Sequence, residues 1–294
     1  MMSRRGRFSW IPMALLAPAT IILATIFILP LIQLILYSFW RFVPGSLIPD
    51  TTLNLGNYQR LITDPYYFGI YGRTIKLSLI ATSLTLILAY PLARFISRQR
   101  TGVKGLLLVL VLLPLIGGAM IQTLGWMVIL MRYGVINGLL LAFGLIDEPI
   151  IFLGREVGII IGLIQSFMPL LVLPLVAALD SIDPALEDAA QSLGASSLRV
   201  FFEVTLPLSI PGAIAGTVLV LMANLTSFVT PSMLGLGKIH VFGTMAYQQA
   251  ILVMDWPFSS AFSLTFLFLI GLVALLMITV RRRLVHRLEA RKEL

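Results

Sequence analysis

The chain of 294 residues is 59% hydrophobic and only 12% charged, with a net charge of +8 and a mean hydropathy of +0.99. A soluble domain averages about a quarter charged residues. This composition therefore excludes a soluble domain and indicates a protein that lies in a lipid bilayer. The basic residues flank apolar runs, which argues against a nucleic-acid-binding surface, and the absence of cysteine excludes disulfides and thiolate metal sites.

Six apolar runs between charged residues predict an all-α membrane protein with six transmembrane helices. A helix needs about 20 apolar residues to cross the hydrocarbon core of a bilayer. The runs of Leu, Ile and Val show no period-two alternation, which argues against membrane-spanning strands. The predicted spans are Phe8–Trp40, Leu77–Ala93, Gly105–Met131, Gly158–Leu179, Val204–Gly237 and Phe258–Val280.

The first run is too long for a cleaved signal peptide. It follows the basic start MMSRRGRFSW and carries no charge over the 33 residues from Phe8 to Trp40. The apolar region of a signal peptide has only about 7–15 residues. We therefore expect a retained first helix.

The distribution of basic residues predicts the orientation of the chain in the membrane. Six spans place both termini on one side, and that side holds fourteen of the 21 Lys and Arg residues, against seven on the other. Because Lys and Arg are enriched in cytoplasmic segments, both termini are expected in the cytoplasm.

The connection between the fourth and fifth spans does not follow this basic bias. From Asp180 to Leu208 it carries five acidic residues against a single basic one. Asp183-Pro184 predicts a helix start, because Asp is a good N-cap and Pro suits the first helical position. Gly194 supplies a left-handed helix end.

Two short amphipathic helices are expected in residues 181–208, which we call the elbow. In the first helix, Leu186, Ala190 and Leu193 share one face at the spacing i, i+4, i+7. Ser196 or Ser197 can cap the second helix, which carries the apolar residues of the string LRVFF. The elbow is therefore predicted to project beneath the membrane, where a partner protein can bind it.

The string EDAAQSLGASSLRVFFEVTLPLSIPG in the elbow resembles the cytoplasmic "EAA" loop of permeases in ATP-binding-cassette (ABC) importers. That loop reads Glu-Ala-Ala, three residues, Gly, nine residues, Ile, one residue and Leu-Pro. This chain keeps every spacing, with Asp and Val as conservative changes at the first position and the Ile position. The matching residues are Asp188, Ala189, Ala190, Gly194, Val204, Leu206 and Pro207.

Other strings are similar to the polyamine branch of these permeases, which imports spermidine- or putrescine-like solutes. They are NYQRLITDPYYF, SFVTPSMLGLG and DWPF. Where that branch usually has an arginine in the third helix, in a string like LIRTYAW, this chain reads MIQTLGW, with Gln122. Related permeases carry opines, aminoethylphosphonate, thiamine or ferric iron, and these solutes remain alternatives.

The resemblance implies a type I ABC importer permease in the bacterial cytoplasmic (inner) membrane. Residues 1–72 would form the tail, first helix and periplasmic loop, residues 73–281 the five-helix permease core with the elbow, and residues 282–294 a basic cytoplasmic tail. The implied partners are an ATPase dimer that binds ATP and Mg²⁺, a second, homologous permease, a periplasmic solute-binding protein and membrane lipid, with no nucleic acid. The chain itself would need no cofactor.

The resemblance also assigns the elbow to coupling with the ATPase, whose closure would switch the helices from inward-open to outward-open. Asp188 would contact the rim of a groove in the ATPase, while the small Ala189 and Ala190 let the two surfaces approach. Gly194 would permit the turn, and Pro207 would end the elbow and fix the entry into the fifth helix. The expected coupling residues are Glu187, Asp188, Ala189, Ala190, Gly194 and Pro207.

No charged residue lies well inside a predicted span, so neutral polar residues are the candidates for a substrate pathway. They are Gln122, Gln165, Asn224 and Ser227. Asn224 and Ser227 are three residues apart and would share a helix face. Hydrogen bonding between helices is the alternative role for these residue types, and packing is the expected role of the GxxxG pair Gly212 and Gly216.

The sequence shows no catalytic or metal site. The string LGLGKIH lacks the Ser or Thr and the spaced Gly of a phosphate-binding loop, and His240 and His286 lie outside the spans without an HExxH pattern. An ion-coupled secondary transporter would keep ionisable residues at membrane depth. We therefore expect a permease without ATPase activity of its own, with a secondary transporter or a membrane enzyme as the alternatives.

Overall fold

The structure is a computed structural model that describes the backbone of residues 11–45 and 50–290, and their side chains except those of 11–15, 276–278 and 280–290. Arg4, Arg5 and Arg7 of the basic start lie outside the described residues, as do Arg291 and Lys292. Within the tail predicted at 282–294, the backbone is helical as far as Ala290. The orientation of the termini stays a prediction.

All the regular secondary-structure elements in the described part of the chain are helices, as predicted. Six described segments are long and apolar enough to cross a membrane, which confirms the predicted number. They are Leu16–Ser38, Pro65–Ser97, Ala119–Ala142, Glu156–Asp180, Ser197–Thr226 and Trp256–Leu275.

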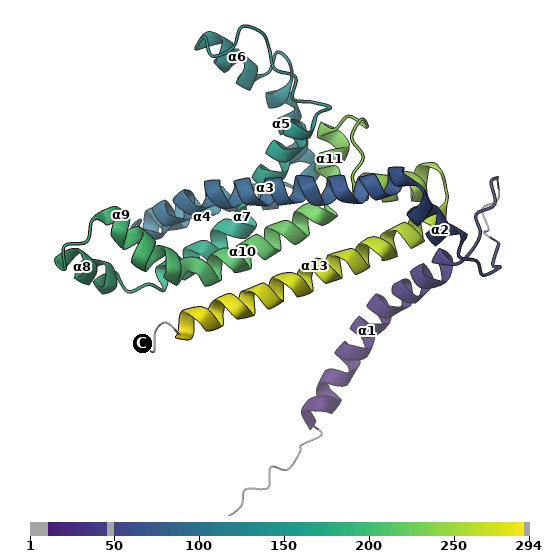
Figure 1. The fold of residues 1–294 in the computed structure, drawn as a ribbon, viewed down its shortest axis with the longest axis horizontal. Helices are drawn as coiled ribbons and strands as arrows, with labels where there is room; N and C mark the ends of the chain where they lie inside the picture. The colour runs from purple at the N-terminus through teal and green to yellow at the C-terminus, as the bar shows by residue number, and fades with distance from the viewer. Residues whose placement is uncertain (1–10, 46–49, 291–294) are drawn as a thin grey trace, which may run out of the picture. The chain divides into compact units, whose positions relative to one another are not determined.

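The larger of two compact units contains Pro65–Ala246 together with the chain from Phe266. Its core consists of α3 (Pro65–Ser97), α7 (Glu156–Asp180) and α10 (Leu206–Thr226), which pack against one another (Figure 1). Small alanines of α3 and branched aliphatic residues of α7 fill the space between the helices.

Two glycines let α10 approach α7 closely. A Cβ placed on Gly212 would lie 2.4 Å from the Cβ of Ala178, and one on Gly216 would lie 2.9 Å from the Cα of Leu171. Glycine pairs at this spacing allow close contact of helix backbones in membranes. The expected packing role of the GxxxG pair is confirmed.

The third predicted span, Gly105–Met131, is wrong as a single helix. α4 (Thr101–Ile116) ends before Gly117, Gly118 has a φ of +76°, and α5 (Ala119–Leu130) begins after it. Positive φ is accessible to glycine without steric cost. A hydropathy profile does not detect this break, because the residues on both sides of it are apolar. α6 (Val135–Ala142) follows at the far end of α5, away from α3, α7 and α10 (Figure 1).

The fifth predicted span, Val204–Gly237, begins earlier and is also interrupted. α9 (Ser197–Val200) continues through a π-helical turn, η1 (Phe201–Thr205), into α10 without a break. After α10 ends, Ser227 adopts extended backbone, and the short α11 (Val229–Leu234) follows.

The smaller unit comprises the described residues up to Asp64 and the segment Tyr247–Thr265. It contains α1 (Ile11–Ser38), α2 (Gly56–Thr63), η2 (Gln248–Leu252) and the first turns of α13 (Trp256–Ala290), while α12 (Phe242–Tyr247) precedes η2. Asn57 Nδ2 ties α2 to the end of α1 by donating to Ser38 O and Trp40 O, each at 2.9 Å.

Asp255 is a buried acid at the start of α13. Its Oδ1 accepts a hydrogen bond from the Phe258 N–H at 2.9 Å, and its Oδ2 lies 3.4 Å from Arg60 Nη1. Burial raises the pKa of the Asp255 carboxyl above its ordinary value, although the Phe258 N–H and the Arg60 charge act in the opposite direction. The Asp255 carboxylate therefore caps α13 and pairs with Arg60 of α2.

Candidate functional site

The first half of the elbow folds as its sequence predicts. α8 (Pro184–Ser192) begins after Asp183, whose side chain accepts a hydrogen bond from the Ala185 N–H at 2.9 Å, and Pro184 takes the first helical position. The chain turns at Gly194, which has a φ of +88° and whose N–H donates to Gln191 O at 2.8 Å. The predicted cap and the left-handed helix end are both confirmed.

The second half of the elbow is continuous with α10. Ser196 caps α9 by accepting from the Arg199 N–H at 3.4 Å. Pro207 lies in the first turn of α10, at the entry into the fifth helix, but the helix runs on from η1 into α10 without a break there. Proline lacks an N–H and its ring crowds the carbonyl four residues earlier. The π-helical turn, in which the Leu206 N–H bonds to Phe201 O, accommodates this conflict.

α8 and α9 lie together at one end of α7 and α10 (Figure 1). Large apolar side chains of the elbow are exposed. The most exposed is Leu193, at 89%. Of the apolar face that the sequence showed, Leu186 and Leu193 are therefore uncovered by the described residues, as on a docking surface, whereas Ala190 is half-buried. We call this surface the elbow face, and its members are Leu186, Asp188, Ala189, Leu193, Leu198 and Phe202.

Glu187 points away from the elbow face and is buried, with only 8% of its surface exposed. Its Oε1 accepts a hydrogen bond from the hydroxyl of Thr205 at 2.7 Å, and its Oε2 forms an ion pair with Arg98. Glu187 was expected among the coupling residues because of its place in the sequence. The structure directs its carboxylate at helices of its own chain.

The other acidic side chains of this region divide into paired and unpaired ones. Asp180 forms an ion pair with Lys104, and Glu203 pairs with Arg199 Nε at 3.0 Å. Asp188 is exposed and forms no ion pair with the described residues. The carboxylate of Asp188 is therefore available on the elbow face.

The two helix breaks of the larger unit meet at a pocket of about 350 Å³, which we call the polar pocket because amide and hydroxyl groups interrupt its otherwise apolar wall. Gln122 of α5 and Ser227 line it, together with Ser166 midway along α7 and Thr230 of α11. Gln122 Nε2 is buried without a hydrogen-bond partner among the described residues. Broken backbone at membrane depth is tolerated only where it is buried in protein or lines a water-filled cavity, and residues next to both breaks line this pocket.

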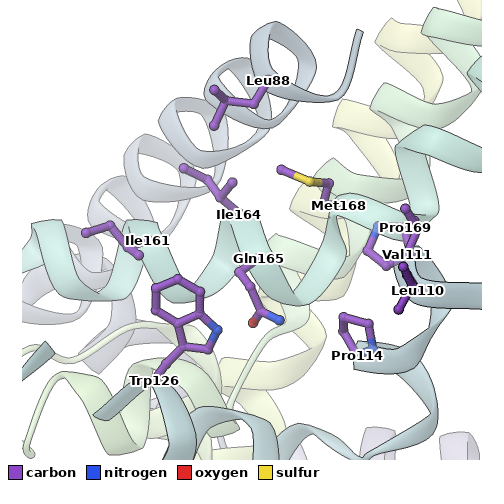
Figure 2. A pocket seen from close by; sticks show the side chains of 10 residues that line it. All are labelled: Leu88, Leu110, Val111, Pro114, Trp126, Ile161, Ile164, Gln165, Met168 and Pro169. Carbon is purple, nitrogen blue, oxygen red and sulfur yellow. The ribbon is translucent and has the colours of Figure 1, made fainter. Parts of the chain in front are cut away.

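Gln165 lines a neighbouring pocket of about 440 Å³ whose other walls are largely apolar. Figure 2 shows its amide between Trp126 and Pro114, and Pro114 also borders the polar pocket. Gln165 Oε1 is buried and has no hydrogen-bond partner in the described structure. Three of the four pathway candidates thus line two adjoining pockets.

Asn224 has the alternative role, hydrogen bonding between helices. It is 3% exposed, and its Nδ2 donates to Thr82 Oγ1 of α3 at 3.0 Å. The predicted helix face shared by Asn224 and Ser227 is wrong, because α10 ends at Thr226 and Ser227 leaves the helix.

Sequence reasoning missed Arg98 and Thr205 as partners of the elbow. Arg98 follows the end of α3 and was counted only as one of the basic residues that set orientation, while Thr205 looked like a spacer in the loop pattern. No sequence signal links them to Glu187. The pair Gly117-Gly118 was a usable signal for the break before α5.

A bundle of membrane-crossing helices with a polar pocket at two helix breaks, and a capped elbow with an exposed face, defines an integral-membrane transport subunit. Over residues 6–293 the chain matches the family described as "Binding-protein-dependent transport system inner membrane component". The chain belongs to this family. It is a multi-pass transporter permease and not an enzyme.

The relatives and the solved structures agree with this assignment. The chain is 35% identical over 235 residues to the spermidine/putrescine transport system permease protein PotB of Escherichia coli (strain K12), with 80% of this chain and 85% of that protein covered. It is 31% identical over 282 residues to the protein of the same name in Haemophilus influenzae, with 96% and 94% covered.

In fold, the chain is similar to a chain in the crystal structure of a bacterial alginate ABC transporter in complex with an alginate pentasaccharide-bound periplasmic protein. The TM-score is 0.73 at 21% identity, with 93% of this chain and 94% of that chain covered. The predicted ABC importer permease fold and the resemblance to the polyamine branch are confirmed.

Proposed function

We propose that this chain is the transmembrane subunit of an ATP-driven importer that moves a polyamine-like solute from a periplasmic binding protein into the cytoplasm by alternating access. The elbow is the observation that carries the proposal. It is a capped structure with an exposed apolar face and a carboxylate, that of Asp188, which forms no ion pair with the described residues. Relatives named as spermidine/putrescine permeases support the class of solute.

The motor belongs to another polypeptide. The sequence has no phosphate-binding loop, so ATP and Mg²⁺ bind to a partner ATPase dimer. Each ATPase holds one elbow in a groove, and closure of the dimer moves two elbows together. The helices then switch between two arrangements, a rigid-body transition driven by a ligand bound elsewhere.

The elbow face has the composition of an interface between proteins. Interface cores are apolar and their rims carry the polar groups. Leu193 and Leu198 form the apolar centre, Asp188 supplies the rim charge, and the small Ala189 permits close approach. Gly194 holds the turn between α8 and α9 that presents both helices to the same partner.

The chain works in the inner membrane with both termini and the elbow in the cytoplasm. The twofold excess of basic residues on the side of the termini supports this orientation. A second permease, homologous to this one but a separate chain, completes the pathway. The periplasmic binding protein delivers the solute from the opposite side.

The polar pocket at the helix breaks forms part of the solute pathway. Its lining offers amide and hydroxyl groups, and no Asp or Glu of the described chain contributes to it. Such a pocket gives an amine hydrogen bonds without a strong ion pair, which would slow its release. Strong and selective binding therefore resides in the periplasmic protein.

Reconstitution tests this function directly. The chain is co-expressed with the ATPase, second permease and binding protein of its own operon, and the purified complex is placed in proteoliposomes. We expect uptake of labelled spermidine that requires ATP and the binding protein, while the purified chain alone hydrolyses no ATP. Uptake driven by an ion gradient without ATP would refute the proposal. ATP-driven uptake of aminoethylphosphonate or thiamine alone would refute its polyamine part.

The pathway role of Gln122 predicts a transport defect without an assembly defect. Gln122→Leu keeps the approximate size of the side chain but removes its hydrogen-bonding groups from the polar pocket. We expect uptake by the assembled complex to fall by about tenfold, the worth of roughly one hydrogen bond. Gln59→Leu, the same substitution at an exposed site on α2, is the control. Unchanged uptake by Gln122→Leu would remove this residue from the pathway.

A further inference from the structure

The burial of Glu187 needs an explanation beyond its place in the sequence pattern. α8 is short and largely exposed, yet the side chain of Glu187 keeps only 10% of its surface accessible. Removing a carboxylate from water is unfavourable unless both of its oxygens are satisfied. Here both are, and each oxygen has a partner on a different segment.

The two partners of Glu187 belong to the parts of the chain that lead into the membrane. Arg98 lies directly after the end of α3, and Thr205 is the last residue of the π-helical turn before α10. Thr205 is fully buried and donates its hydroxyl hydrogen to Glu187 Oε1. One carboxylate thus joins α8, α3 and the start of α10.

The first residue of the π-helical turn is also held by α3. The guanidinium of Arg94 lies 4.7 Å from the ring centroid of Phe201, and the ring of Tyr90 meets Phe201 edge-on at 5.6 Å. The Tyr90 hydroxyl is 2.7 Å from Ser209 Oγ, one turn further along α10. α3 therefore contacts the start of the π-helical turn and the first turn of α10 that follows it, and Glu187 links the elbow to these contacts.

A π-helical turn usually occurs as a single-turn bulge inside an α-helix, frequently at a functional site, and is one of the places where helices kink. Without lateral ties, a displacement of the elbow would be absorbed in residues 201–205 and would not reach α10. The ties across this turn make the elbow, the end of α3 and the start of α10 move as one body.

We propose that Glu187 is a positioning residue, a buried joint with Arg98 and Thr205 that passes movement of the elbow into α3 and α10. It is not part of the surface that the ATPase touches. The proposal rests on the coupling role of the elbow stated above. Loss of the joint leaves the ATPase bound and active, but the movement that ATP hydrolysis causes in the ATPase no longer produces transport.

Neighbouring neutral substitutions separate the joint from the docking surface. Glu187→Gln keeps the size of the side chain and an acceptor for Thr205 but removes the ion pair with Arg98, whereas Asp188→Asn changes only the exposed carboxylate. In the reconstituted complex, the measured quantities are the amount of bound ATPase, the rate of ATP hydrolysis and the solute transported per ATP. We expect Glu187→Gln to lower solute per ATP about tenfold, the worth of one hydrogen bond to a charged group at its weaker end, with ATPase binding unchanged.

Substitutions at Thr205 provide a second test of the joint. This test stays valid even if the Glu187→Gln chain folds poorly. Thr205→Val keeps the shape and loses the hydroxyl, so it should reproduce the uncoupling. Thr205→Ser restores the donor and should restore solute per ATP. The double variant Glu187→Gln/Thr205→Val should lower solute per ATP by less than the product of the two single effects, because the two substitutions break different bonds of the same three-residue joint.

The outcomes distinguish the possible roles of Glu187. Reduced ATPase binding with normal solute per ATP would make Glu187 a docking residue and overturn the joint. A lower yield or thermal stability with normal solute per ATP would make it merely structural and also overturn the joint. If the unsubstituted complex did not transport the solute with ATP, the proposed function itself would be refuted.

Discussion

Complexes of the Asp188→Lys chain are expected to lose the partner ATPase on purification, while the chain itself folds normally. Asp188 is exposed and unpaired among the described residues, so its replacement leaves no internal group unsatisfied. In the docked state, however, a lysine would place the opposite charge and a longer side chain against the groove. Placing like charges against each other across an interface costs several kcal/mol, which lowers the affinity at least tenfold.

Affinity purification through the permease, with the co-purified ATPase quantified per permease, measures this effect. Asp147→Lys is the matched control, because Asp147 is also exposed but lies in the loop after α6 rather than on the elbow. The control should recover the full amount of ATPase. If Asp188→Lys also recovers it, the elbow face is not the docking surface for the ATPase.

The Gly212→Ala chain should be strongly destabilised, although the substitution adds only one methyl group. The new Cβ would meet the Cβ of Ala178 at 2.4 Å and the carbonyl oxygen of Pro174 at 2.6 Å. The carbonyl is backbone, so α10 and α7 have to move apart along their main contact. Overpacking of this kind costs about 1–3 kcal/mol or more, and we expect a lower apparent Tm and a lower yield of folded permease in detergent.

An alanine at a different helical glycine supplies the control. Gly125 lies inside α5, and a Cβ built on it meets nothing within 4 Å. Alanine is favoured over glycine in a helix by up to about 1 kcal/mol, so Gly125→Ala should keep or raise the Tm. Equal Tm values for the two variants would mean that α10 and α7 do not pack as closely as the structure has them.

Local chemistry was sufficient for the features of the elbow that depend on neighbouring residues. The cap at Asp183 and the turn at Gly194 were predicted because a helix start and a left-handed helix end are decided within a few residues. The same is true of the six apolar segments, because crossing the hydrocarbon core is a matter of length and hydropathy. The ATPase-coupling role read from the elbow pattern stays a proposal.

The directions of the side chains on the elbow depended on tertiary packing. The sequence pattern placed Leu193 and Glu187 on different faces of α8, but only the packing of α8 against α9 and η1 decided which face is inside. The carboxylate is buried and the leucine exposed, because Arg98 and Thr205 satisfy Glu187 while the surface of the larger unit offers Leu193 no apolar cover.

The sequence by itself determined an all-helical membrane chain of six apolar segments, with a capped elbow and glycines for close packing. Only the tertiary structure decided where those segments break and which polar groups meet there. Apolar residues on both sides of Gly118 hide that break from any measure of hydropathy. The pocket that contains Gln122 and Ser227 exists because two interrupted helices from distant parts of the chain lie together, and contacts of that range are not encoded in local sequence.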